Sequence, residues 1–159
     1  MVLAHARALL ASRPEGACAY LDADLRDMRK VLRAASRLLD FDQPVAVMLI
    51  GVLHLIPDPD DPAGLVTQLI GALPAGSWLA IAHPASDVAS DKVAIMTDRY
   101  NQRVSTAATL RTHAEISAFF AGTDLLPPGV VQYQQWHPGE PARDAEGEVA
   151  AYCGLGRKP

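Results

Sequence analysis

Clusters of basic residues are absent from this sequence. Its 14 lysines and arginines are outnumbered by 18 aspartates and glutamates, which gives a formal net charge of −4. Proteins that bind nucleic acids or anionic membranes through charge need a concentrated positive field. The composition therefore argues against nucleic acid and membrane as partners.

Cysteine is scarce, because only Cys18 and Cys153 are present and they lie far apart in no metal-ligand spacing. We interpret both as small buried apolar residues in a reducing compartment, and we expect no metal site. The first ten residues carry His5 and Arg7 where a signal peptide has an uninterrupted apolar core. We therefore expect a cytoplasmic protein.

Strong catalytic motifs are missing as well. The sequence contains no G-x-S-x-G elbow, no H-E-x-x-H pair and no Walker phosphate loop. Its one Gly-x-Gly, at 154–156, lies close to the end of the sequence with no helix to follow, so it cannot hold a phosphate at a helix N-terminus.

The most informative segment is the apolar run from Val45 to Ile56, bounded by Pro44 and Pro57. It is too short for a membrane span, which needs about 20 apolar residues. A strand with one wet face would alternate polar and apolar residues, and this run does not. The run therefore predicts a central parallel strand covered on both faces, and a buried core helix is the alternative.

The predicted elements alternate around this run. We expect a helix from residue 1, a short strand at 17–21, a helix from Met28 to Leu39 capped by Asp27, and then the central strand. Asp61 and Pro62 open a further helix, and residues 77–83 form a strand. This order is typical of a doubly wound α/β fold within a single domain, residues 1–159.

The remaining residues predict two more helices and a terminal pair of strands. Val93, Met96 and Tyr100 mark an exposed helix, and a capping box from Thr112 to Glu115 introduces another. Strand patterns follow at 125–126, 130–136 and 149–155. No helix separates the last two, so we expect parallel strands followed by a C-terminal antiparallel hairpin.

Ligands of an open parallel sheet bind at the carboxyl ends of the strands. Asp24, Gly51, His54 and His83 are expected there. Asp24 could bind an amine or cap the next helix, and Gly51 could admit a ligand or mark a bulge. The histidines could act as general bases or be structural.

Three segments carry a resemblance to a known family. Residues 20–27 (YLDADLRD), 41–46 (FDQPVA) and 52–58 (VLHLIPD) resemble the actinobacterial S-adenosylmethionine-dependent methyltransferase family, and so does the ending GLGRKP. The resemblance covers nearly the whole chain. It implies a Rossmann-like class I methyltransferase sheet, S-adenosyl-L-methionine as cofactor and a small-molecule substrate.

The resemblance also implies site residues. In such folds the acidic residue after the third strand binds the adenine amine and the next backbone amide meets the ring, which gives Asp24 and Leu25 here. The methionine part of the cofactor passes Ile50 and Gly51. His54 and His83 are the candidates for a catalytic base, and Tyr100 is a candidate for the substrate pocket.

The family's first two strands and first helix have no counterpart in this sequence, so the resemblance implies an N-terminally truncated, partial domain. We expect unpaired sheet edges and self-association through them. Two functions follow: a methyltransferase whose activity in this truncated form is in question, or a non-catalytic remnant that serves as a binding or oligomerisation module. A misassigned gene start is a third explanation.

Overall fold

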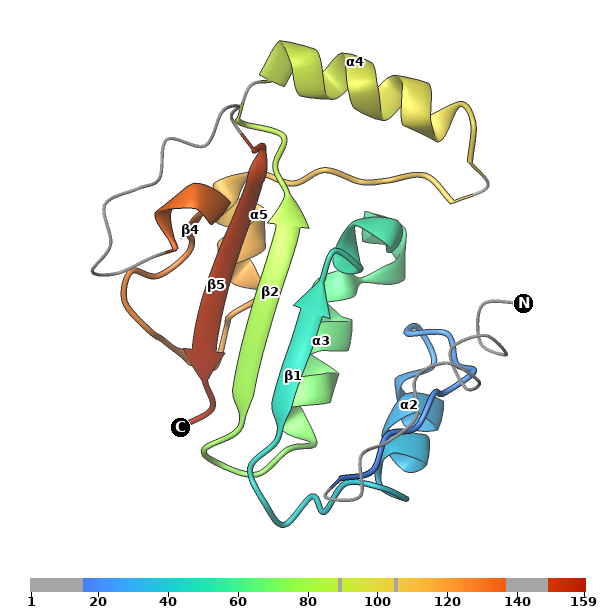
Figure 1. Ribbon diagram of the computed structural model, residues 1–159, viewed down its shortest axis with the longest axis vertical. Coiled ribbons are helices and arrows are strands. Elements are labelled where there is room, and N and C mark those ends of the chain that lie inside the picture. The colour runs from blue at the N-terminus through green and yellow to red at the C-terminus, as the bar shows by residue number, and fades with distance from the viewer. Residues whose placement is uncertain (1–15, 89, 105, 137–148) are drawn as a thin grey trace.

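The structure is a computed structural model, which describes residues 16–88, 90–104, 106–136 and 149–159. A mixed sheet forms its centre, with helices packed against it (Figure 1). The predicted helix at the start of the chain lies outside the described residues. No helix in the described ranges is long and apolar enough to cross a membrane.

The sheet has five strands in the order β1-β2-β5-β3, with β4 also pairing with β5. Their bounds are β1 Ala46–Ile50, β2 Trp78–Pro84, β3 Asp124–Leu125, β4 Val131–Gln132 and β5 Ala151–Arg157. β1 and β2 are parallel, and β5 runs antiparallel to β2, β3 and β4. The predicted parallel strands with a terminal antiparallel strand pair are confirmed, with β5 inserted between β2 and its shorter neighbours.

Local sequence signals set the helices, which are α2 Met28–Ala35, α3 Pro62–Gly71, α4 Ser90–Asn101 and α5 His113–Ala118. Asp27 accepts a hydrogen bond from the Lys30 amide at the start of α2, and Asp61 accepts one from the Gly64 amide at the start of α3. The predicted capping box of α5 is present. α2 ends at Ala35, one turn before the predicted Leu39, because the chain there continues in turns.

The core lies between the sheet and α2, α3 and α5. An apolar stripe of α3, continued by one residue just beyond its end, is buried there and comprises Leu65, Val66, Leu69, Ile70 and Leu73. Leu49 of β1 and Leu79 and Ile81 of β2 meet this stripe from the sheet. Gly154 and Gly156 of β5 leave room for Phe120 and Thr123, whose side chains stand where a Cβ would be. These glycines therefore serve close packing.

The prediction that both faces of the apolar run are covered is wrong. β1 is five residues long, and a 3-10 turn, η1 Leu53–Leu55, follows it. Within the described residues β1 is an edge strand, and Met48 and Ile50 on its outer face are 69% and 54% exposed. Figure 1 shows α3 and α5 behind the sheet, and none of the described helices lies in front of β1.

One further strand prediction is wrong, and another holds only in part. Residues 17–21 form no strand, since no neighbouring strand pairs with them among the described residues. The segment 130–136 contributes only Val131–Gln132 to the sheet and then turns into η3 Tyr133–Gln135. In η3, Tyr133 is 57% exposed, and with Trp136 it borders a groove on the open face of the sheet.

Candidate functional site

The loop after β1 carries His54 to the carboxyl end of the sheet. Gly51 leaves the strand with φ +62°, a left-handed conformation that glycine adopts without strain. Its amide donates to the carbonyl of Ala82 at 2.9 Å, and the amide of Thr109 donates to the carbonyl of His54 at 2.7 Å. Leu53 beside it is 1% exposed. The backbone of His54 is therefore held from both sides.

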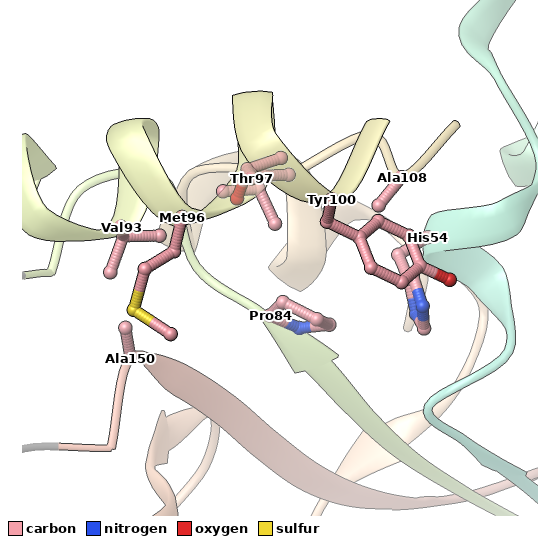
Figure 2. A pocket seen from close by; sticks show the side chains of 9 residues that line it. His54, Pro84, Val93, Met96, Thr97, Tyr100, Ala108 and Ala150 are labelled. Atoms are coloured by element: carbon pink, nitrogen blue, oxygen red, sulfur yellow. The ribbon is translucent and has the colours of Figure 1, made fainter. Parts of the chain in front are cut away.

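A cavity of about 440 Å³ opens beside His54, at the carboxyl ends of β1 and β2. Helix α4 lies across these ends, at the top of Figure 1. Figure 2 shows the side chains of α4 over Pro84, with Tyr100 next to His54. The described lining consists of His54, Pro84, Val93, Met96, Thr97, Tyr100, Ala108, Leu110 and Ala150. We call this cavity the His54 pocket.

His54 has a ring nitrogen without a partner. Its Nδ1 is buried and makes no hydrogen bond within the described structure. Burial, helped by the charge of Arg111, lowers the pKa of His54 below its ordinary value of 6.5. The imidazole is therefore neutral near pH 7, and its Nδ1 is too deeply buried for a ligand to reach it.

His83 contacts His54 edge to face, with ring centroids 6.1 Å apart, and is 1% exposed. Its Nδ1 donates to the carbonyl of Pro84 at 2.8 Å, so Nε2 must be the unprotonated nitrogen, and it accepts from Nη1 of Arg111 at 3.0 Å. Burial is the main cause that lowers the pKa of His83 to about 4. Both ring nitrogens are engaged, so His83 is placed to support the site rather than to exchange a proton with a ligand.

Arg111 is the residue that the sequence did not single out. It is 4% exposed, and its guanidinium donates to the carbonyls of Leu53 and Ile56 and to the carboxylate of Asp58. It thus ties the loop after β1 to His83 of β2. An arginine just before a capping box gives no sign of burial, because its partners lie 28 to 58 residues away in the chain.

Asp24 follows no strand and lies on the surface. Its side chain is 52% exposed and pairs with Arg26, whose guanidinium also bonds Asp60. Hydrogen bonds from Arg26 lower the pKa of Asp24 to about 2, so the carboxylate is ionised. Because Asp60 belongs to η2 Asp58–Asp60, this chain of ion pairs brings Asp24 next to the loop after β1.

The remaining predicted residues lie in three places. Tyr100 lines the His54 pocket, as does His54 itself. Ile50 borders the groove on the open face, whereas Leu25 packs partly against the core. A Cβ built on Gly51 would have no atom within 4 Å, so its backbone faces open space. No group of three or more metal-ligating side chains occurs in the described ranges.

Comparisons with known proteins agree on the class of protein. The family model described as S-adenosyl methyltransferase matches residues 1–159. A duf574 family protein from Streptomyces avermitilis MA-4680 is 38% identical with a TM-score of 0.91, and a proposed methyltransferase from Thermobifida fusca YX is 33% identical with a TM-score of 0.84. Both alignments cover 99% of this chain, which spans 62% and 59% of the two relatives.

A more distant structure shares the fold alone. An O-methyltransferase family protein from Burkholderia thailandensis is 14% identical, with a TM-score of 0.55 over 88% of this chain and 35% of its own. No curated protein matches the chain significantly. The mixed sheet is that of a Rossmann-like class I methyltransferase. On the family match and the two close relatives, the chain belongs to the S-adenosyl methyltransferase family, whose cofactor is S-adenosyl-L-methionine.

Proposed function

We propose that this chain takes part in methyl transfer from S-adenosyl-L-methionine to a small molecule held in the His54 pocket, in the cytoplasm. The observation that carries the proposal is the pocket itself. It lies at the carboxyl ends of two parallel strands, where open α/β sheets bind their ligands, and His54 lines it.

The residues around the loop after β1 suit the cofactor. Asp24 is an ionised carboxylate in contact with solvent whose two oxygens accept from Arg26, and it can accept one more hydrogen bond from the adenine amine, with the backbone of Leu25 next to the ring. The backbone of Gly51 faces open space and, with that of Ile50, would adjoin the methionine part. When bound, the cofactor supplies an electrophilic methyl group.

The chemistry asks little of the protein beyond alignment. Holding the acceptor at the correct distance and angle accounts for most of the rate in such a displacement. His54 is neutral and positioned at the pocket, so it is the proposed general base. His83, the other candidate for the base, is proposed only as a supporting residue, because Pro84 and Arg111 occupy its two ring nitrogens.

Isothermal titration with S-adenosyl-L-methionine and its demethylated product tests the cofactor site. We expect saturable binding that weakens at least about tenfold in Asp24→Ala, because one charge-assisted hydrogen bond is worth roughly 1.5–3 kcal/mol. Asp22→Ala is the matched control, since Asp22 is exposed and two residues away. Absence of binding, or equal weakening in the control, would contradict the proposal.

A second function, self-association or binding through β1, is favoured by a separate observation. The amide of Trp78 donates to the carbonyl of Val45, and the amide of Gly51 donates to the carbonyl of Ala82. Because backbone direction alternates along a strand, the groups of Ala46, Met48 and Ile50 point to the free edge. Exposed edges with apolar side chains pair with other chains.

Light scattering tests this second function. We expect a concentration-dependent dimer that Met48→Lys shifts to the monomer, because a lysine on an edge opposes strand addition. Met96→Lys is the control, since Met96 is 70% exposed but belongs to α4. A strict monomer at high concentration would reject edge pairing and leave the methyl-transfer proposal unaffected.

A further inference from the structure

The described lining of the His54 pocket contains no Asp, Glu, Lys or Arg. Six of its nine residues are apolar, namely Pro84, Val93, Met96, Ala108, Leu110 and Ala150. Thr97, Tyr100 and His54 provide the polar atoms. A volume of about 440 Å³ lies in the range of sites for single small molecules.

The charged side chains near the pocket interact with groups outside it. Arg111 donates to backbone carbonyls, to His83 and to Asp58, and it lines a different hollow together with Asp58 and Glu115. A carboxylate or ammonium group on a ligand would therefore meet no opposite charge among the described lining residues. Removing such a group from water without a partner is costly, so the apolar part of the described lining favours uncharged ligands.

The polar and aromatic groups define what the ligand should carry. Tyr100, a residue that is 46% exposed, brings an aromatic ring to the lining, and Met96, which is 70% exposed, brings a thioether. Aromatic rings and thioethers both make favourable contacts with a flat aromatic ligand. His54 is the single imidazole of the described lining, and it can accept a hydrogen bond from one hydroxyl group.

We propose that the methyl acceptor is an uncharged, mostly apolar aromatic molecule with one hydroxyl group, and that this hydroxyl bonds to His54. This inference rests on the proposed function for the transfer step. In that step His54 takes the hydroxyl proton while the acceptor oxygen forms its bond to the methyl carbon. The carbon–sulfur bond breaks with its electron pair on sulfur, which leaves a neutral thioether, and the imidazolium then returns its proton to solvent.

The test compares two probes that share a naphthalene ring, without any cofactor. 2-Naphthol is uncharged and 2-naphthoate is an anion at neutral pH, and both are titrated into the ¹⁵N-labelled chain. We expect 2-naphthol to shift the backbone amides of His54, Ala108 and Leu110 with a Kd at least tenfold lower than that of 2-naphthoate. Equal affinities would overturn the inference. Shifts confined to Ala80 and Leu155 would overturn it too, because those residues line the open-face groove instead.

A variant reverses the expected preference. Thr97→Lys puts a cation on the pocket wall and should tighten 2-naphthoate binding at least tenfold. The matched control is Gln102→Lys, which adds the same charge at an exposed position just beyond α4 and should leave both affinities unchanged. Equal tightening in both variants would show a general charge effect and overturn the assignment to this pocket.

Two results separate this inference from the proposed function. Selective binding of 2-naphthol by a chain that fails to bind S-adenosyl-L-methionine would support the ligand class and reject methyl transfer by this chain. Cofactor binding without selectivity for 2-naphthol would support methyl transfer by this chain and reject the ligand class.

Discussion

Arg111 and His83 form a buried hydrogen-bonded pair in which Nη1 donates to Nε2 over 3.0 Å. The arginine is always charged, so the histidine must stay neutral to accept this bond. One side of the pair belongs to β2, and the other holds the loop that presents His54. The pair thus connects the sheet to the loop that carries His54.

Replacing the arginine tests how much this connection stabilises the fold. In Arg111→Met the carbonyl of Ile56 and the Nε2 of His83 lose their donor, whereas the carbonyl of Leu53 keeps the amide of Ile56. Each buried unsatisfied group costs roughly 1–3 kcal/mol, so the free energy of unfolding should fall by about 3 kcal/mol. Urea denaturation measures the fall. Arg103→Met is the control, because Arg103 is exposed and should change stability by less than about 0.5 kcal/mol.

The second prediction concerns pH. The pKa of His83 is about 4 in the folded chain and about 6.5 in the unfolded chain, so between these values the unfolded chain binds more protons. Stability should therefore decrease as pH falls from 6.5 toward 4, by at most about 3 kcal/mol from this group. Arg111, His54 and Glu115 are the charged and titratable groups acting on His83.

The measurement compares urea midpoints of the wild-type chain and His83→Asn at pH 7, 6 and 5. Asparagine does not titrate, so its curve should be flatter, and the remaining slope should reflect His54 and the carboxylates. Parallel curves for the two proteins would show that His83 does not titrate as expected.

Two glycines give a matched pair of substitutions. Both have open space at the position of a Cβ, but Gly51 has φ +62° and Gly71 does not have a positive φ. Gly51→Ala should destabilise by about 1–2 kcal/mol through backbone strain. Gly71→Ala should stabilise slightly, because alanine is the better helix former by about 1 kcal/mol. Thermal unfolding distinguishes them, and equal effects would contradict the role of Gly51 as a left-handed strand exit.

Elements with local signals were predictable from sequence. Asp27, Asp61 and Thr112 cap their helices with partners no more than three residues away, and each cap lies where its pattern predicted it. The terminal strand pair was predictable too, because no helical segment separates its members. These interactions need no knowledge of the rest of the fold.

Elements that depend on partners far along the chain were not predictable from the sequence. The apolar run around Met48 has the composition of a strand covered on both faces. Its burial, however, depends on which other elements pack against it, and hydrophobic periodicity does not reveal those elements. Residues 17–21 have the composition of a strand but no neighbour to pair with among the described residues. Arg111 is important only through contacts far along the chain, and no spacing rule reveals them.

The candidate site shows the same division. His54 was predicted to lie at the carboxyl end of a strand, where open sheets bind ligands, and it lines a pocket there. Tyr100, which was predicted to lie on an exposed helix, lines the same pocket. The sequence could not show which of the two histidines is available to a ligand, because that depends on the hydrogen bonds of His83 to Pro84 and Arg111. The role of Asp24 stays a prediction.

The central claim is that the cofactor binds at the carboxyl end of β1, between the turn of Asp24 and the strand exit at Gly51. A titration of the ¹⁵N-labelled chain with the demethylated product of S-adenosyl-L-methionine tests it most directly. We predict saturable shifts of the Leu25 and Gly51 amides, with those of Gly122 and Gly129 unchanged. Shifts at Gly122 and Gly129 instead, or none at saturating ligand, would contradict the account.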